Sequence, residues 1–245
     1  GQSPGVIVMP RYPGNLTLMA ARPEHVDAMA DVHVDAFPGE FMTLLGRGVL
    51  RAFYRWYVQR PGGIALVVLD PGEEAILGLV AGGDPALKSQ FMRRHALRLA
   101  VAALAASVRH PRARGRLVEH LQTAARRVTA PGHSARGQFG ATAEHEPPAP
   151  AAGTWSNLLS ICTSPAARGR GVGRLLMEGF RDESRRRGLA GMRLSVHNDN
   201  EAAIALYEQC GWRRVLVTPS GTFFWQEIDL TSRGAADSDD ERQSP

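Results

Sequence analysis

The chain has 245 residues, and 44% of them are hydrophobic, so it can bury a sizeable core without disulfide or metal staples. Two cysteines, Cys162 and Cys210, exclude a disulfide framework and fit no metal-ligand spacing, which favours a reducing, cytoplasmic setting and predicts no metal. No apolar run approaches the roughly 20 residues of a membrane span, and no signal-peptide pattern opens the chain, so we expect a soluble protein.

A net charge of +5 suits an anionic partner, which could be a nucleotide cofactor, a nucleic acid or an acidic lipid. Charge alone does not choose among these three classes. The choice depends on the motifs along the chain.

The first elements are predicted to be a loosely held terminus, a strand and a helix. Residues 1–14 are rich in glycine and proline, whereas residues 15–20 alternate as a strand does. Residues 22–37 have apolar residues at helical spacing, with Pro23 suited to the first turn. His33 falls on the apolar side of this helix.

A second helix and a hairpin should follow. Pro38 and Gly39 stop the first helix, and a second is expected from about Phe41. Its apolar stripe is formed by Met42, Leu45, Val49, Phe53 and Trp56. Two strands, at residues 64–70 and 75–82, are separated by the turn sequence "PGEE".

The region from Asp84 to Gly153 has a different character and is interpreted as an insertion. Apolar residues recur at helical spacing and predict two amphipathic helices broken near Pro111. The stripes consist of Leu97, Val101, Leu104 and Val108, then Leu117, Leu121 and Val128. Positions 84–130 contain ten basic residues and only two acidic ones. The rest of the region, up to Gly153, has the composition of a loop. We expect the apolar stripes to pack on the rest of the domain.

The last third alternates strands with helices, which predicts a partly parallel sheet covered by helices, an α/β (α+β) fold class. Strands are expected at 155–163, at 192–197 and from 212 and 222, and helices at 172–187 and 201–210. The polar tail at 231–245 is expected to be disordered.

Three glycines in "SPAARGRGVGRLL" lie where the strand 155–163 turns into the helix that begins at Val172. A glycine-rich loop before a helix N-terminus is an anion site, because unpaired N–H groups and the positive end of the helix dipole converge there. The loop lacks the Lys-Ser/Thr pair of a Walker motif. It also lacks the acidic residue of a dinucleotide fingerprint.

The residues from Leu158 to Trp212 resemble the GNAT superfamily of acyl-CoA N-acyltransferases. Its pyrophosphate motif is matched by Arg168, Gly171 and Gly173. Its second signature is matched by Asn200, Ala203, Leu206, Tyr207, Gly211 and Trp212. The resemblance implies a mixed central sheet with helices on both faces. It further implies a single domain at 15–230 that carries the helical insertion at 84–153.

The resemblance also implies acetyl-CoA as co-substrate. By this resemblance, the pantetheine arm of acetyl-CoA would be bound by Ile161, Cys162 and Thr163, with Asn200 and Ala203 beside it. The diphosphate would be bound by Arg168, Gly169, Arg170, Gly171, Val172, Gly173 and Arg174. Tyr207 would protonate the departing thiolate. The alternative is that Tyr207 is only an aromatic core residue on the buried face of its helix.

The base that deprotonates the amine is less well defined. Many GNAT enzymes place a carboxylate on the strand before the loop, whereas this chain has Ser156, Asn157 and Ser160 there. His33 and Glu40 are the candidates for the general base in place of that carboxylate. The alternative is that His33 is a hydrogen-bonded core histidine and that Glu40 caps the second helix. Cys162 as a nucleophile is disfavoured, because no histidine stands at a spacing that would activate it. The remaining acceptor-side candidates are Phe37, Asn157, Arg93, Arg94 and Arg98.

The sequence thus predicts direct acetyl transfer from acetyl-CoA to a primary amine, in particular a small and anionic amine drawn in by the insertion's arginines. Alternatively these arginines are simply solvated. The alternative functions are acetylation of a protein N-terminus or lysine, and binding of acyl-CoA or nucleic acid without catalysis. Nucleic acid is not the expected partner, and the oligomeric state is open, with a homodimer as one option.

Overall fold

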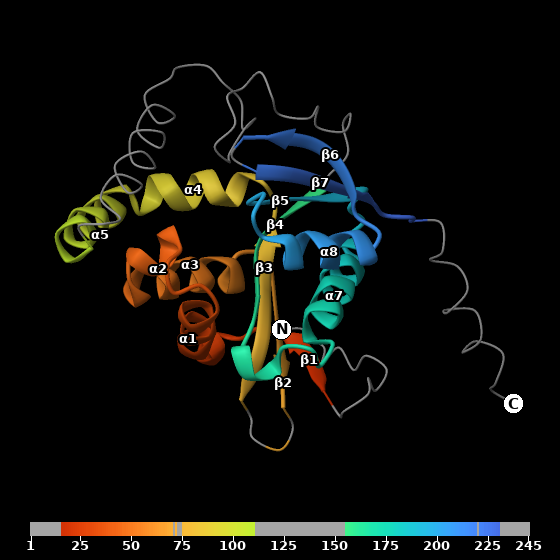
Figure 1. Ribbon diagram of the computed structural model, residues 1–245, viewed down its shortest axis with the longest axis horizontal. Coiled ribbons are helices and arrows are strands. Elements are labelled where there is room, and N and C mark those ends of the chain that lie inside the picture. Colours follow the sequence, from red (N-terminus) through yellow and green to blue (C-terminus); the bar gives the residue numbers. More distant parts are fainter. Residues whose placement is uncertain (1–15, 71, 73–74, 111–154, 220, 231–245) are drawn as a thin grey trace, which may run out of the picture.

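The computed structural model describes residues 16–70, 72, 75–110, 155–219 and 221–230 (Figure 1). These residues form a seven-stranded sheet in the order β1-β2-β3-β4-β5-β7-β6. The strands are β1 (Thr17–Ala20), β2 (Gly63–Leu69), β3 (Ile76–Gly83), β4 (Trp155–Thr163), β5 (Gly191–Val196), β6 (Arg213–Thr218) and β7 (Gly221–Glu227). All neighbouring pairs are antiparallel except β4 and β5, which are parallel. The predicted mixed sheet is confirmed.

Helices cover both faces of the sheet, as predicted (Figure 1). The first half of the chain supplies η1 (Pro23–His25), α1 (Val26–Ala36), α2 (Phe41–Leu44), α3 (Arg47–Gln59), α4 (Ala86–Arg94) and α5 (Ala96–Arg109). The second half supplies η4 (Pro165–Ala167), α7 (Val172–Arg186) and α8 (Glu201–Gln209). α7 packs against β1 to β5, α1 and α3 pack on the other face, and α4 and α5 lie against α3.

Residues 41–56 do not form the single helix that their apolar spacing predicts. Gly46 has a left-handed φ of 97° and separates α2 from α3. α3 is also rotated relative to the predicted stripe, since it buries Leu50, Tyr54 and Tyr57 fully. Trp56 stays only partly buried. The side of α3 that faces the sheet is therefore aromatic and polar at Tyr54, which matters for the site below.

α5 buries the opposite face from the one predicted. Leu97 and Leu104 are 80% and 69% exposed, whereas Ala103 and Ala106 are fully buried against α3. Small alanine side chains let two helices approach closely, so packing here follows the fit of the surfaces and not the larger apolar stripe. The second predicted helix and the loop up to residue 153 lie outside the described residues.

β4 contains a bulge that changes which face its side chains reach. Ser160 pairs with Ala81 and Leu158 pairs with Gly82, so Leu159 is an extra residue on β4. In a regular strand Ser156 and Ser160 would share a face. Here Ser156 contacts Ser184 on α7, whereas Ser160 contacts Tyr54 on α3.

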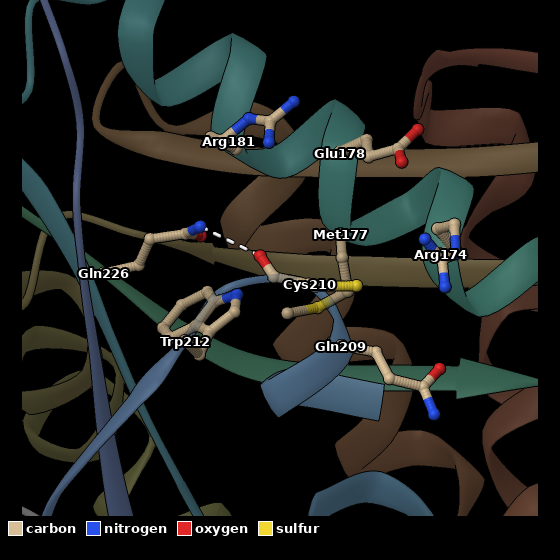
Figure 2. A pocket seen from close by; sticks show the side chains of 8 residues that line it. All are labelled: Arg174, Met177, Glu178, Arg181, Gln209, Cys210, Trp212 and Gln226. Carbon is tan, nitrogen blue, oxygen red and sulfur yellow. Dashed lines mark hydrogen bonds between the residues drawn. The ribbon is translucent and has the colours of Figure 1, made fainter. Parts of the chain in front are cut away.

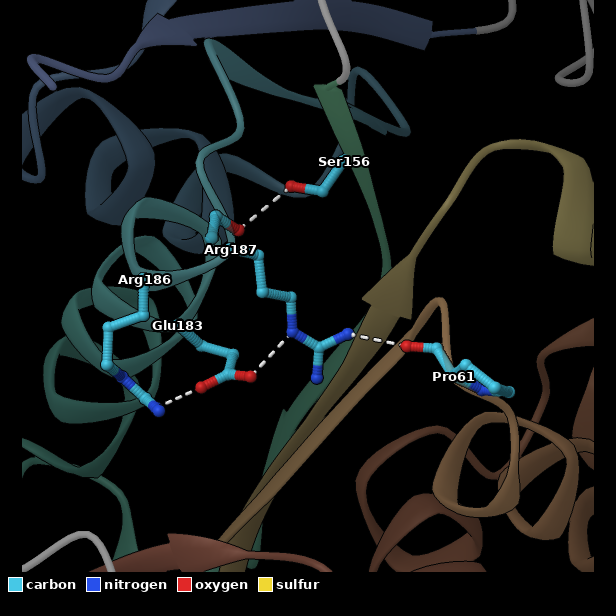
Figure 3. A network of polar contacts seen from close by, with 6 residues as sticks. Pro61, Ser156, Glu183, Arg186 and Arg187 are labelled. Carbon is cyan, nitrogen blue, oxygen red and sulfur yellow. Dashed lines mark hydrogen bonds and ion pairs between the residues drawn. The ribbon is translucent and has the colours of Figure 1, made fainter.

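The C-terminal end of α7 is fixed by polar contacts that Figure 3 shows. Arg187 donates to Glu183 at 2.6 Å and to the carbonyl oxygen of Pro61 at 3.1 Å, and Arg186 also pairs with Glu183. The hydroxyl oxygens of Ser156 on β4 and Ser184 on α7 are 3.0 Å apart. The C-terminal end of α7 is thus tied to the sheet and to the turn before β2.

Candidate functional site

β4 and β5 run side by side only where they begin. Their register covers three pairs and ends at Asn157 and Arg193. Beyond this point β4 continues to Thr163 and stays paired with β3, but it has no register partner on β5 in the described part of the sheet. The β5-facing edge of β4 can therefore accept an extended ligand that hydrogen-bonds as an added strand would.

The glycine loop, residues 168–174, begins immediately beyond this opening. Gly169 and Gly171 have left-handed φ values of 77° and 80°. Gly171 is the N-cap of α7, and a Cβ placed on either glycine would meet no atom within 4 Å. The space in front of the loop is open. The first N–H groups of α7 have no intrahelical partner and point into it, so this loop has the geometry of an anion site.

The arginines of the loop are arranged less uniformly than its backbone. Arg170 donates to Asp70 on the turn after β2 at 3.1 Å, and this contact lowers the pKa of the Asp70 carboxyl. Arg174 extends instead toward a small pocket between α7 and the end of α8 (Figure 2). The backbone is consequently the main source of donors at the loop.

The small pocket in Figure 2 has a volume of about 120 Å³ and is too small for a cofactor. Cys210 lies there with a half-buried thiol, and its carbonyl oxygen accepts a hydrogen bond from Gln226 at 2.9 Å. Of the predicted site residues, only Arg174 lines this pocket.

Asn200 and Tyr207 belong to the N-cap and the body of α8, whose Leu206 lies close to Gly173 of the glycine loop. Asn200 caps the helix, since its side-chain oxygen accepts from the N–H of Ala203 at 3.2 Å. Tyr207 is 5% exposed and packs on Phe224 and Trp212. Burial raises the pKa of Tyr207 well above its ordinary value, so the hydroxyl keeps its proton at neutral pH.

His33 belongs to a buried polar chain that ends on β4. Its Nδ1 is 2.6 Å from the hydroxyl oxygen of Tyr54, which is 3.0 Å from the hydroxyl oxygen of Ser160. Burial lowers the pKa of His33 to about 4, so the ring is neutral at pH 7. Its Nε2 is buried and has no hydrogen-bond partner among the described residues.

Comparisons with known proteins agree with this geometry. Residues 134–212 match the Acetyltransferase (GNAT) family. This segment of the chain, about a third of its length, is similar to that family. Among the residues that the structure describes, no helix is long and apolar enough to cross a membrane.

A curated relative is the [ribosomal protein bS18]-alanine N-acetyltransferase of Escherichia coli K12, which is 39% identical over 62 residues. The match covers 25% of this chain and 42% of that protein, so the chain spans less than half of the relative's length. The similarity is therefore concentrated in one GNAT segment.

Solved structures share the fold over most of the chain. The ribosomal-protein-S18-alanine N-acetyltransferase of Escherichia coli aligns with a TM-score of 0.50 and 14% identity, over 90% of this chain and 98% of that one. The protein yncA of Salmonella typhimurium, solved with its cofactor acetyl-CoA, aligns with a TM-score of 0.50 and 17% identity over the same shares. At these identities the likeness concerns the fold.

The other predicted GNAT site residues are only partly brought together. Phe37 packs edge-on against His33, with ring centroids 5.3 Å apart. Glu40 is exposed at the N-cap of α2, and Asn157 is buried within the sheet. Arg94 and Arg98 line a different pocket, on the outward side of α3, while Arg93 is exposed beside it.

Cys162 lies beside Tyr54 and Ser160, but its environment does not favour a nucleophile. It is buried, and burial raises the pKa of its thiol to about 12. A thiol that keeps its proton at neutral pH is a poor nucleophile. This environment does not favour an acyl-cysteine intermediate.

Sequence reasoning missed Tyr54 and Ser160, which connect His33 to β4. Tyr54 follows Leu50 by one helical turn, and this spacing could have indicated the true buried face of α3. Ser160 carries no such signal, because its direction depends on the bulge at Leu159.

Proposed function

We propose that this chain is an N-acetyltransferase that transfers the acetyl group of acetyl-CoA to a primary amine by direct attack in a ternary complex. The observation that carries this proposal is the opening between β4 and β5, which ends at a left-handed glycine on the N-terminus of α7. Bound acetyl-CoA would supply an activated thioester in this opening.

The residues present fit such a ligand. The free edge of β4 at Ile161, Cys162 and Thr163 offers backbone groups to the amide-bearing pantetheine arm. The glycine loop offers N–H groups to the diphosphate, without side-chain bulk in front of Gly169 and Gly171. Gly173 would crowd Leu206, at 3.1 Å, if it carried a Cβ, which supports close packing of α7 on α8 behind the ligand.

Tyr207 acts as the general acid in this proposal. When the amine nitrogen attacks the thioester carbonyl, the C–S bond breaks and the sulfur takes up negative charge. A phenol hydroxyl that stays protonated can deliver its proton to that sulfur and regain one from solvent. The burial of Tyr207 and its raised pKa support this role.

His33 receives a proton from the amine in this proposal, directly or through a water. Neutralising a lysine-like amine at pH 7 costs about 4 to 5 kcal/mol, so an acceptor for the proton is needed. When Nδ1 donates to Tyr54 and Tyr54 donates to Ser160, Nε2 is left as a free acceptor. With a pKa of about 4 His33 is a weak base, so it orients the amine and releases the proton that it receives at Nε2 to solvent water.

The acceptor is proposed to be a small primary amine. A second candidate is the α-amino group of a protein N-terminus, favoured by the bS18-alanine N-acetyltransferase that shares 39% identity over 62 residues. Residues 84–153 are proposed as the insertion that distinguishes the two, because a cover over the acceptor side would exclude a peptide.

The test is a thiol-release assay with acetyl-CoA and two acceptor panels. One panel holds small amines, including amino sugars and phosphorylated amines, and the other holds short peptides that begin with alanine or carry an internal lysine. Amine-dependent release of CoA supports the enzyme, and the better panel assigns the acceptor class. CoA binding without release on either panel would reduce the protein to a binding module.

A further inference from the structure

A second and larger hollow lies on the outward side of α3, where α4 and α5 meet it. Its volume is about 530 Å³. Five arginines line it, and we name it the arginine pocket: Arg51, Arg55, Arg60, Arg94 and Arg98. Trp56 forms part of the wall. A hollow of this size accommodates a ligand as large as a nucleotide.

The arginine pocket is separate from the proposed acetyl-transfer site. Tyr54 points from α3 toward His33 and Ser160. Successive helix residues are about 100° apart, so the lining residues Arg55, Gln59 and Ala52 project roughly 100° to 160° away from Tyr54 around α3. None of the described residues that line the pocket belongs to β4, β5, α7 or α8.

The charges in this pocket are unbalanced. Asp27 is the single carboxylate in the described lining, and it pairs with Arg51 at 2.7 Å. Elsewhere in the described chain, arginines such as Arg187 and Arg214 pair with carboxylates. Converging like charges without counter-charges costs free energy unless an anion binds.

Besides Arg51, two of the five guanidinium groups are held in place by contacts that leave their charge available. Arg98 donates to the carbonyl oxygen of Gly48 at 2.8 Å, and Arg60 lies over the Trp56 ring at 4.1 Å. A Cβ on Gly48 would lie 3.3 Å from Arg98, so glycine leaves room for it. Trp56 is itself fixed by a hydrogen bond to the Leu87 carbonyl oxygen, at 3.1 Å.

Arg55 and Arg94 face the same hollow and are exposed. Within the described residues, no ion pair involves either of them. His95, between Arg94 and Arg98, has a pKa lowered first by burial and then by these two cations. The pocket thus combines fixed guanidinium groups with two that can close on a ligand.

We propose that the arginine pocket binds a small ligand that carries two or more phosphate groups. Guanidinium groups bind phosphate oxygens through two parallel hydrogen bonds, and several of them together match an oligophosphate better than a single carboxylate. This site goes beyond the acetyl-transfer function and does not depend on it.

The test is calorimetric titration of tripolyphosphate into the full chain saturated with CoA, which occupies the glycine loop. One site per chain is expected, with an affinity that falls as salt rises. The double variant Arg55→Gln/Arg94→Gln should bind at least about tenfold more weakly. Neither side chain has a described partner, so the fold should be kept, and the thermal midpoint checks this.

The matched control is Arg213→Gln/Arg214→Gln, which removes the same charge from β6, where both arginines are paired with glutamates. It should bind tripolyphosphate as the wild type does. Equal weakening in both double variants would reduce the effect to net charge and overturn the site. So would absence of tripolyphosphate binding, or binding of a short RNA duplex alone. If CoA fails to bind, the two variants still decide the question without it.

Discussion

The glycine loop and the arginine pocket are both candidate phosphate sites, but they draw their donors from different parts of the chain. The loop uses backbone N–H groups at the start of α7, exposed by the left-handed Gly171. The pocket uses side chains from α3, α4 and α5. Backbone donors are fixed by the fold, whereas guanidinium groups can be removed one at a time. Glycine substitutions should therefore affect the first site and charge substitutions the second.

The largest effect is expected for Gly171→Glu. The new side chain must adopt φ near 80° and places a carboxylate where a diphosphate would sit, so acetyl-CoA affinity should fall by more than about a hundredfold in calorimetry. Gly188→Glu is the matched control, since Gly188 has φ of 71° and open space at the other end of the same helix. If Gly171→Glu bound acetyl-CoA with wild-type affinity, the glycine loop would not be the diphosphate site.

Tyr207→Phe should leave both phosphate sites intact and slow the chemistry. Losing a general acid lowers turnover by about a hundredfold or more, while the dissociation constant for acetyl-CoA should stay within about twofold. Steady-state kinetics with the best acceptor, together with calorimetry, separates the two quantities. Unchanged turnover would make Tyr207 a core residue that packs on Phe224.

His33→Asn should lower turnover by about tenfold and leave both phosphate sites unchanged, because we propose His33 as the group that receives the proton of the acceptor amine. It should also change the pH dependence of stability. Burial lowers the pKa of His33 from 6.5 to about 4, so the unfolded chain takes up the proton first and stability falls as pH falls through this window.

At pH 5 this loss is on the order of 2 kcal/mol relative to pH 7.5, and it should be absent in His33→Asn. Urea unfolding of both proteins at the two pH values measures it. Parallel pH dependence in the two proteins would show that His33 titrates normally.

Arg170→Gln should have the smallest effect. Arg170 already pairs with Asp70 at 3.1 Å, so its charge is partly balanced and acetyl-CoA affinity should change by less than about threefold. This result would sharpen the contrast with the arginine pocket. A tenfold loss would instead make the glycine loop a side-chain site.

The same contrast explains how much the sequence could predict. The helix from Val172 and the helix from Glu201 begin where their local signals place them, because glycines and caps act over a few residues. The glycine loop is likewise one continuous segment. Its residues form a visible motif.

Features that depend on packing between distant segments were not predictable in this way. The bulge at Leu159 turns Ser160 toward Tyr54, and the alanine face of α5 is buried in place of Leu97 and Leu104. The arginine pocket joins residues from positions 51 to 98 that share no spacing. Each of these features depends on the surface of the distant segment against which the helix or strand packs.

Amide hydrogen exchange in the presence and absence of acetyl-CoA tests the central claim most directly. The N–H groups of Val172, Gly173 and Arg174 begin α7 without intrahelical partners, so they exchange quickly until a ligand accepts their hydrogen bonds. We predict that saturating acetyl-CoA protects residues 169–174 and the end of β4, while residues 48–60 of the arginine pocket are unchanged. Binding seen by calorimetry without protection at residues 169–174 would contradict the account.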